Sequence, residues 1–367
     1  MPRTRTRRTG IDALRAQIDR IDEQLLALLN RRAEFVREIG ERKKAGGRGG
    51  FYVPGREKRI YQRLKALNRG PLPTDSVRTI FREVISSCLA LEQPLRIAYL
   101  GPEATYSHLA ALEQFGTRAS LLPADSIAGV FDEVEHRRAD YGVVPVENST
   151  QGVVALTLDR FVSSPLTIKA EVLLRIDHYL LSRSGRREDV RRIVSHAQSL
   201  GQCRRWLAEN FPGVPHEEVS SNARAAAQAA RQAGTAAIAG RLAADHYDLR
   251  AVAAHIQDEA QNLTRFFVIG SDGIGAPTGD DKTTVMFSVR HEPGVLFRLL
   301  KPFSDNKVNL TSIESRPLTG RPWEYFFFID FEGHARDRRV TRALKTLEAQ
   351  SLSCRVLGSY AAARQPA

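Results

Sequence analysis

The sequence predicts three structural units: an all-α helical unit, a two-lobed α/β unit and an α+β unit of ferredoxin-like order. Three patterns predict this organisation. Apolar residues recur every three or four positions over residues 11–39, which is typical of one long helix. Strands and helices alternate over residues 94–270, as in a doubly wound sheet. The last segment follows the order βαββαβ. We expect the units to span residues 10–93, 94–271 and 282–361.

Composition indicates a globular protein of the cytoplasm. The chain has 367 residues, 42% of them hydrophobic and 26% charged, which suggests two to three domains. It contains no apolar run long enough to span a membrane, and residues 1–10 are basic without the apolar core of a secretory signal. The three cysteines, Cys88, Cys203 and Cys354, are far apart and odd in number. We therefore expect a reducing compartment, no disulfide framework and no metal or other cofactor.

The positive charge is concentrated in the first unit. Of the formal net charge of +12, residues 1–93 carry +10, with 21 Lys and Arg against 11 Asp and Glu. Such an excess fits either nucleic acid or a small polyanion as a partner.

The first helix has a coiled-coil-like seam that contains a charge. Arg32 occupies a seam position, and a buried guanidinium needs an anion from protein or ligand. Lys43 lies on the same face, about 16 Å along the axis. Two shorter helices are expected over residues 56–68 and 74–91. Three amphipathic helices with an overlong first one do not close a core alone, so we expect a dimer. The other seam residues are Ile11, Leu14, Ile18, Ile21, Leu25, Leu28, Phe35 and Ile39.

These helices resemble the all-helical chorismate mutase domain. The matching motifs are Leu14-Arg15, Asp22-x-x-Leu25-Leu26-x-Leu28-Leu29-x-x-Arg32, Gly40-x-x-Lys43, Arg56-Glu57 and Cys88-x-x-x-Glu92. The reaction is pericyclic, so the site must hold chorismate compact and place positive charge beside the ether oxygen. The resemblance implies that Arg15 and Arg32 grip the two carboxylates and that Lys43 and Glu92 face the ether oxygen. Arg56 would assist a carboxylate and Glu57 would hold the hydroxyl.

The predicted mutase site requires a second chain. Arg15 lies about 25 Å from Arg32 along the helix, too far for both to bind one small ligand from the same chain. Two positions depart from the family pattern. Val53, at a position of the predicted site, stands where some members have Asp, so that side-chain contact is absent. Glu92 stands where many members have Gln.

Polar loops follow the strands of the middle unit. They occur at residues 101–107, 147–152, 195–203 and 220–223. A glycine turn before a hydroxyl-rich helix start is typical of an anion-binding helix N-terminus. Taken singly, each loop is more often a helix N-cap than a ligand site, but four of them in one segment favour a ligand site. Residues 263–270 read as a buried strand that ends at Gly270, with an amide, the Thr264 hydroxyl and the Arg265 guanidinium at its mouth.

The middle unit closely resembles prephenate dehydratase in two motifs, Glu147-Asn148-Ser149-Thr150-x-Gly152 and Thr264-Arg265-Phe266. The family has two lobes like those of periplasmic binding proteins, with the active site in the cleft. The resemblance assigns catalysis to Thr264, which would hydrogen-bond the leaving hydroxyl of prephenate. Arg265 either binds a carboxylate or is structural. The expected cleft residues are Glu147, Asn148, Ser149, Ser195, His196, Gln198, Ser221 and Asn222.

The last unit resembles an ACT domain of the phenylalanine-sensing kind. The matching motifs are Pro293-Gly294-Val295-Leu296 and Glu314-Ser315-Arg316-Pro317, and the resemblance makes them the binding loops for phenylalanine. A purely structural dimerisation module is the alternative. Residues 272–281, rich in Gly and Asp, are expected to form the linker before this unit.

The whole chain thus resembles the bifunctional chorismate mutase/prephenate dehydratases with a C-terminal phenylalanine-binding ACT domain. The resemblance implies an allosteric, homodimeric enzyme of phenylalanine biosynthesis without nucleic-acid or membrane partners. A transcription regulator would need a short helix-turn-helix in place of the long first helix. A fused dehydrogenase would need G-x-G-x-x-G after a strand, whereas residues 46–50 follow a helix. A catalytically silent amino-acid sensor would be distinguished by a turnover assay.

Overall fold

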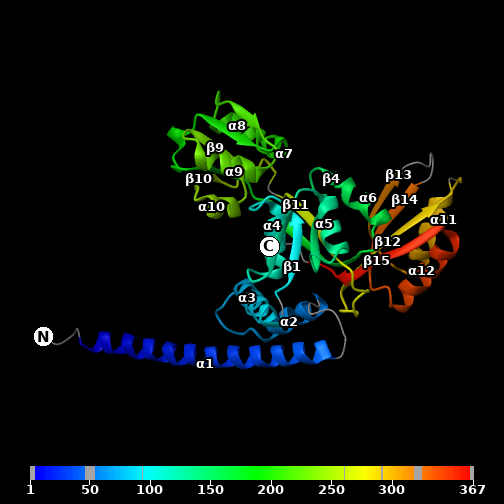
Figure 1. Ribbon diagram of the computed structural model, residues 1–367, viewed down its shortest axis with the longest axis horizontal. Helices are drawn as coiled ribbons and strands as arrows, with labels where there is room; N and C mark the ends of the chain where they lie inside the picture. The colour runs from blue at the N-terminus through cyan, green and yellow to red at the C-terminus, as the bar shows by residue number, and fades with distance from the viewer. Residues whose placement is uncertain are drawn as a thin grey trace.

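The computed structural model describes residues 5–45, 54–92, 94–259, 261–290, 292–317 and 325–363. Side chains are described from residue 10 onward within these ranges, except for residues 44, 45, 54 and 92. The three predicted units are present in chain order: a helical part, a two-lobed α/β part and an α+β part (Figure 1).

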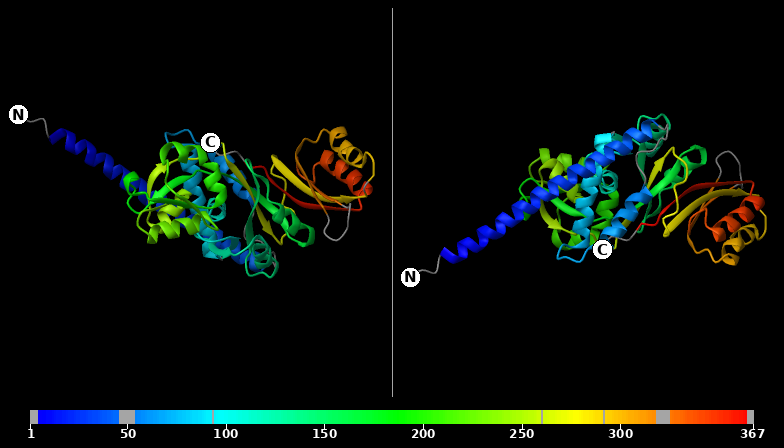
Figure 2. Two further views of the ribbon diagram at one scale, coloured as in Figure 1. Left: turned by 90° about the horizontal axis from the view of Figure 1, so that it is seen from above. Right: turned by 90° about the horizontal axis from the view of Figure 1, so that it is seen from below.

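The helical part consists of α1 (Arg5–Ala45), α2 (Pro54–Leu67) and α3 (Thr74–Glu92). The first helix is longer than predicted, with 41 residues, and its N-terminal half projects away from the rest of the molecule (Figures 1 and 2). The apolar seam is exposed along the projecting helix: Ile11, Leu14, Ile18, Ile21, Leu25, Leu28 and Phe35 are each more than half exposed. A helix with a bare apolar stripe is incomplete as a monomer.

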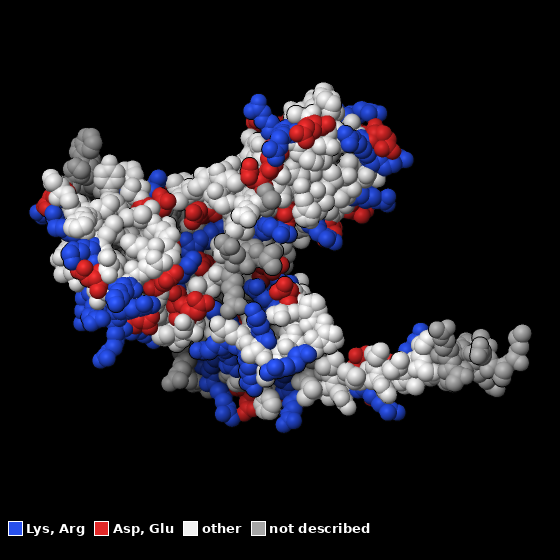
Figure 3. All heavy atoms as spheres, turned by 180° about the vertical axis from the view of Figure 1, so that it is seen from behind, with Lys and Arg blue, Asp and Glu red and all other residues white. Residues whose placement is uncertain are grey.

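The third helix attaches the helical part to the α/β part. Arg82 donates a hydrogen bond to Glu113 at 2.5 Å. Glu83 accepts a hydrogen bond from the Thr117 hydroxyl at 2.6 Å. Figure 3 shows Lys and Arg side chains gathered over the helical part, beside the point where α1 leaves the body.

Lobe 1 of the α/β part is a six-stranded sheet in the order β2-β1-β3-β11-β5, with β4 paired to β3. Strands β1, β2 and β3 are parallel, whereas β11 runs antiparallel to both of its neighbours. The predicted doubly wound sheet is thus mixed at its centre. Its elements are β1 (Arg96–Leu100), α4 (Tyr106–Phe115), β2 (Ser120–Ala124), α5 (Ile127–Glu135), β3 (Tyr141–Asn148), β4 (Gly152–Val153), α6 (Ala155–Ser163), β5 (Thr167–Arg175) and β11 (Leu263–Gly270).

Lobe 2 is a five-stranded sheet in the order β10-β6-β9-β7-β8. Its small core residues, including Ala225, Ala229 and Ala237, let α9 pack closely on the sheet. The elements are β6 (Tyr179–Ser182), the 3₁₀ turn η1 (Arg187–Asp189), β7 (Arg192–Ser195), α7 (Ala197–Gln202), α8 (Arg204–Asn210), β8 (His216–Glu218), α9 (Asn222–Arg231), β9 (Thr235–Ala239), α10 (Arg241–Tyr247) and β10 (Arg250–Ala254).

Two segments of the chain connect the lobes, and these segments are hydrogen-bonded to each other. The Ile176 amide donates to the Asn262 carbonyl at 2.8 Å, and the Ile256 amide donates to the His178 carbonyl at 3.0 Å. The Gln257 side chain also accepts from the His178 amide at 3.0 Å. The two crossings therefore form one paired connection at the boundary between the lobes.

The α+β part has the predicted βαββαβ order, with sheet order β13-β14-β12-β15. One face of this antiparallel sheet packs against α11 and α12, where Phe287, Phe303 and Phe331 are buried. The elements are β12 (Asp281–Val289), α11 (Val295–Asp305), β13 (Leu310–Pro317), β14 (Tyr325–Glu332), α12 (Arg338–Gln350) and β15 (Ser353–Ala361). The predicted linker ends at β12, whose first residue is Asp281.

The other face of that sheet shares a core with lobe 1. Met286, Phe328 and Leu357 belong to the same buried cluster as Phe267 and Ile168 of lobe 1. At Gly358 the two backbones approach so closely that a Cβ would overlap the carbonyl oxygen of Ile168. Separation of the C-terminal unit would therefore expose the core of lobe 1 to water.

Candidate active sites and the family of the chain

The structure places Arg32 on the part of α1 that faces the helical bundle. Its Nη1 is buried and has no hydrogen-bond partner among the described residues. An unpaired buried guanidinium nitrogen is costly, so this atom is suited to bind an anion. Lys43 and Glu57 each take part in an interaction within the chain.

Other predicted mutase residues are distributed differently. Arg15 is exposed on the projecting half of α1, 3.5 Å from Asp12. Arg56 is exposed at the start of α2, and Cys88 is buried in α3. Val53 and the Glu92 side chain lie outside the described residues.

Thr264 lies at the beginning of β11, beside the C-terminal end of β3. Antiparallel pairing places it directly opposite Asn148. The Asn148 amide nitrogen donates to the Thr264 hydroxyl at 2.8 Å and to the Asn262 side-chain oxygen at 2.8 Å. Two motifs more than a hundred residues apart in sequence thus meet at one point.

The amide orientation of Asn148 follows from its other contacts. Its side-chain oxygen accepts from the Thr150 backbone amide at 3.1 Å and from the Thr150 hydroxyl at 2.6 Å. A backbone amide can only donate, so Nδ2 must face Thr264. Because Thr264 accepts this bond through a lone pair, its own hydroxyl hydrogen remains able to point toward a ligand.

Asn262 leaves a donor available beside Thr264. The residue is 2% exposed, and its Nδ2 has no hydrogen-bond partner among the described residues. A buried amide donor without a partner is rare in proteins. This atom and the Thr264 hydroxyl can therefore both donate to oxygen atoms of a bound molecule.

A series of hydrogen bonds continues from Asn148 into lobe 2. Gln202 donates to the Thr150 hydroxyl at 3.0 Å, and the Gln202 side-chain oxygen lies 2.8 Å from His178 Nε2. Tyr106 lies 3.0 Å from the other ring nitrogen, Nδ1, and donates to the Asp177 carbonyl. The Gln202–Thr150 bond joins the two lobes directly.

The ionisation states in this series are determined by burial. His178 is 1% exposed, and burial lowers its pKa, partly offset by its hydrogen bond to Gln202. Burial raises the pKa of Tyr106 well above its usual range. Both groups are therefore neutral near pH 7. The Nε2 atom of Gln202 donates to Thr150, so the Oε1 atom of Gln202 faces His178 as an acceptor. His178 therefore carries its proton on its own Nε2 atom.

The expected residues of lobe 2 form a separate cluster. The Asn222 side-chain oxygen accepts from the Ser195 hydroxyl, the His196 amide and the Ser199 hydroxyl at 3.1–3.3 Å. His196 caps α7, where its Nδ1 accepts from the Gln198 amide, and Ser221 caps α9. These contacts fit the N-cap alternative, and they fix the start of α7, the helix whose last residue is Gln202.

Glu147 and Arg265 lie on the opposite face of the sheet from Thr264, because neighbouring strand residues alternate between faces. Together with Lys282, Ser312 and other residues they line a cavity of about 200 Å³ between lobe 1 and the α+β part. Ser149 also lines this cavity, and its hydroxyl accepts from the Leu263 amide at 2.9 Å.

The second predicted binding loop, residues 314–317, is the end of strand β13 in the structure, and it contacts lobe 1. Arg316 makes two hydrogen bonds to Asp159 of α6, at 2.9 and 3.0 Å. Burial, and then the charge of Glu147, raise the pKa of Glu314. The first predicted loop, which includes Pro293, leads into α11 through Gly294 in the left-handed conformation, with φ of 74°.

Five polar residues of this site were not predicted as site residues from the sequence: His178, Tyr106, Asn262, Thr150 and Gln202. All but His178 lie within or next to the predicted polar loops and motifs, so their position was the available signal. His178 could be recognised only from the fold. Among the described residues, no group of three or more His, Cys, Asp or Glu could hold a metal. No helix in the described part of the chain is long and apolar enough to cross a membrane.

The fold and these sites define an enzyme in which a helical anion-binding domain, a two-lobed α/β domain and an α+β domain are joined. The family model for chorismate mutase type II matches residues 14–93. The model for prephenate dehydratase matches residues 97–274, and that for the ACT domain matches residues 283–349.

Whole-length relatives give the same assignment. The chain is 46% identical over 351 residues to the bifunctional chorismate mutase/prephenate dehydratase of Aquifex aeolicus, covering 95% of this chain and 96% of the relative. It is 45% identical to that of Pseudomonas aeruginosa, covering 95% and 97%. A prephenate dehydratase from Arthrobacter aurescens, solved in complex with L-Phe, has a TM-score of 0.69 and 36% identity, covering 74% of this chain and 92% of that one.

The chain belongs to the family of bifunctional chorismate mutase/prephenate dehydratases. It therefore carries both activities and acts in phenylalanine biosynthesis.

The buried state of His178 leads to a pH-dependent stability. The folded pKa is lowered, so below about pH 6.5 the unfolded chain binds a proton that the folded chain does not. Stability falls as pH drops through this range. We expect the stability difference between wild type and His178→Asn to shrink from about pH 8 to pH 5. Urea unfolding at each pH measures it, and a difference independent of pH would contradict the assignment.

Proposed function

We propose that each mutase site combines Arg32, Lys43, Arg56, Glu57 and Glu92 of one chain with Arg15 of another. The observation that carries this proposal is the unpaired, buried Nη1 of Arg32. It provides a charged donor for a carboxylate of chorismate. Lys43 and Glu92 would stabilise the ether oxygen as the bond breaks, since negative charge develops there. The positions of Val53 and Cys88 complete the pocket in this proposal.

A homodimer is part of the same proposal. The exposed stripe on α1, from Ile11 to Phe35, needs an apolar partner. A second copy of α1 would cover the stripe and bring Arg15 across to Arg32.

The unpaired cysteines, of which Cys88 and Cys203 are buried, support a reducing, cytoplasmic location.

Complementation tests the shared mutase site. Arg15→Ala and Arg32→Ala should each abolish mutase turnover. When they are mixed and refolded together, each heterodimer should contain one intact site, so roughly a quarter of wild-type activity should return. The readout is chorismate consumption.

The matched control combines Arg32→Ala with Lys43→Ala, which affect the same side of the site. This mixture should show no recovery, because neither heterodimer site would be complete. Absence of recovery in the first mixture, with heterodimers shown to form, would count against a shared site.

For the dehydratase we propose that the Thr264 hydroxyl donates a hydrogen bond to the leaving hydroxyl of prephenate. Asn148 orients Thr264 by occupying its lone pair, and Asn262 offers a second donor. Aromatisation of the ring drives the loss of carbon dioxide, so the main task is to stabilise the departing oxygen. A Thr hydroxyl is a weak acid, which suits hydrogen-bond donation better than full proton transfer.

Thr264→Ala should lower dehydratase kcat at least about a hundredfold, the cost of losing one donor to a developing oxyanion. Thr264→Ser keeps the hydroxyl and should retain much of the activity. Mutase turnover of the same preparations should be unchanged, because that site lies in another domain. Incubation with chorismate, followed by assays of prephenate and phenylpyruvate, measures both steps. Equal loss of both activities in a natively folded Thr264→Ala protein would contradict the two-site proposal.

We also propose that phenylalanine inhibits the dehydratase by binding at the loops Pro293-Gly294-Val295-Leu296 and Glu314-Ser315-Arg316-Pro317. The L-Phe complex of the Arthrobacter relative supports this ligand. The Arg316–Asp159 contact connects the second loop to lobe 1. Binding there would shift an equilibrium between two arrangements of the domains.

Point variants test this regulation better than truncation, because the ACT domain shares a core with lobe 1. Glu314→Ala should raise the phenylalanine concentration for half-inhibition about tenfold, which corresponds to about 1.4 kcal/mol of binding free energy. The control is Glu332→Ala, a change of an exposed carboxylate at the C-terminal end of β14. Unaltered inhibition in the Glu314 variant would place the effector site elsewhere.

A further inference from the structure

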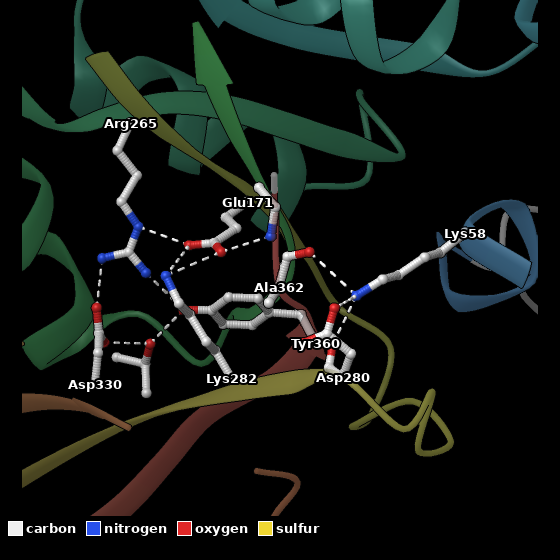
Figure 4. Close-up of polar contacts among 10 residues, drawn as sticks. Lys58, Glu171, Arg265, Asp280, Lys282, Asp330, Tyr360 and Ala362 are labelled. Atoms are coloured by element: carbon white, nitrogen blue, oxygen red, sulfur yellow. Dashed lines mark hydrogen bonds and ion pairs between the residues drawn. The ribbon is translucent and has the colours of Figure 1, made fainter. Parts of the chain in front are cut away.

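The Arg265 guanidinium is fully engaged on the face of lobe 1 that meets the ACT domain (Figure 4). Its Nε donates to Glu171 of β5 at 2.8 Å. Its Nη1 donates to Asp330 of β14, and its Nη2 donates to the Tyr360 hydroxyl of β15 at 3.0 Å. The three nitrogens thus contact three strands, and two of these strands belong to the ACT domain.

The partners of Arg265 are themselves fixed. Thr284 donates to the second oxygen of Asp330 at 2.6 Å and lies 2.7 Å from the Tyr360 hydroxyl. Glu171 accepts from the Ala363 amide at 2.8 Å. The guanidinium also lies 4.7 Å above the ring centre of Phe267. A cross-domain network with this many partners defines one geometry.

The ion pairs that Arg265 makes with Glu171 and Asp330 are buried. The side chains of Arg265, Glu171 and Asp330 are 10%, 0% and 8% exposed. Burial alone would lower the pKa of Arg265, but the surrounding groups, Tyr360 first among them, outweigh this effect and raise the pKa. The guanidinium therefore stays charged, and removal of one partner leaves a buried charge uncompensated.

The position of Arg265 connects this network to the dehydratase site. It follows Thr264 directly on β11, and the two side chains project from opposite faces of the strand. Between Arg265 and Phe266 the pairing of β11 with β3 shifts register. The backbone ladder is therefore irregular beside Thr264, and the side chain of Arg265 supplies an additional anchor there.

From these contacts we propose that Arg265 is a positioning residue of the dehydratase, and that Asp330 of the ACT domain is the anchor that holds it. The ACT domain thereby supports the strand end that presents Thr264. The inference rests on the catalytic role proposed for Thr264. It favours the structural alternative for Arg265, since a carboxylate bound to this guanidinium would lie on the face of the sheet opposite to Thr264.

The test is steady-state turnover of prephenate by the full chain carrying Arg265→Lys, Asp330→Asn or both. We expect each single change to lower kcat about tenfold with KM changed less than about twofold. The double variant should have a kcat no lower than that of the less active single variant, because both changes disrupt the same contact between the guanidinium and the carboxylate. Glu113→Gln is the matched control. It breaks a more exposed ion pair between lobe 1 and α3 and should leave basal dehydratase kcat unchanged.

Two outcomes would overturn the inference. A raised KM in Arg265→Lys, with normal kinetics in Asp330→Asn, would make Arg265 a direct ligand of prephenate. Independent, multiplicative losses in the double variant would show that the two residues do not act through one contact.

Far-UV circular dichroism and urea unfolding of each sample report whether lobe 1 and the ACT domain have folded, since mutase turnover reports only on the helical domain. If Asp330→Asn does not fold, Tyr360→Phe removes only the hydrogen bond to Nη2 and should give a smaller fall in kcat at constant KM; an unchanged kcat would then overturn the inference. Thr264→Ala in the same assay separates the two proposals. Full activity of that variant would refute the catalytic role of Thr264, whereas its loss beside an unaffected Asp330→Asn would refute only the positioning role.

Discussion

The antiparallel insertion of β11 between β3 and β5 is the constraint on which the dehydratase depends. A parallel strand at this place would put Thr264 at the opposite end of the strands, away from the loop that follows β3. Because β11 runs the other way, its first residues lie where β3 ends, and Thr264 faces Asn148. The same geometry returns the chain from lobe 2 at the boundary between the lobes, where Gln202 reaches Thr150.

The two faces of β11 therefore lie in different environments. Its Thr264 face looks toward the lobe boundary, with Asn148 and a series of neutral hydrogen-bonding groups. Its Arg265 face looks toward the ACT domain, with charged partners buried between two sheets. In the proposed mechanism, neutral groups beside Thr264 avoid a fixed negative charge where the leaving oxygen would gain electron density. The charged groups lie on the opposite face of β11.

Most of the architecture could be predicted from the sequence, because the spacing of apolar residues and the residues that begin and end helices and strands are local properties. The long α1, the βαββαβ order and the strand over residues 263–270 all follow from such patterns. The orientation of β11 could not be predicted, since it depends on where lobe 2 returns the chain. His178 was missed for a related reason: it lies in none of the predicted loops, and only the fold brings it to Gln202 and Tyr106. The partners of Arg265 lie 65 to 95 residues away in sequence, which local reasoning does not reach.

The shared core of lobe 1 and the ACT domain affects the order in which the protein can be completed. Synthesis on the ribosome delivers the helical part first and β15 last. Lobe 1 receives its own strand β11 well before Leu357 and Tyr360, which complete its core, have been made. Until then, the apolar face around Phe267 has no cover. The nascent dehydratase thus passes through a stage with exposed apolar surface, and chains that end before β15 retain that surface as a site for aggregation or degradation.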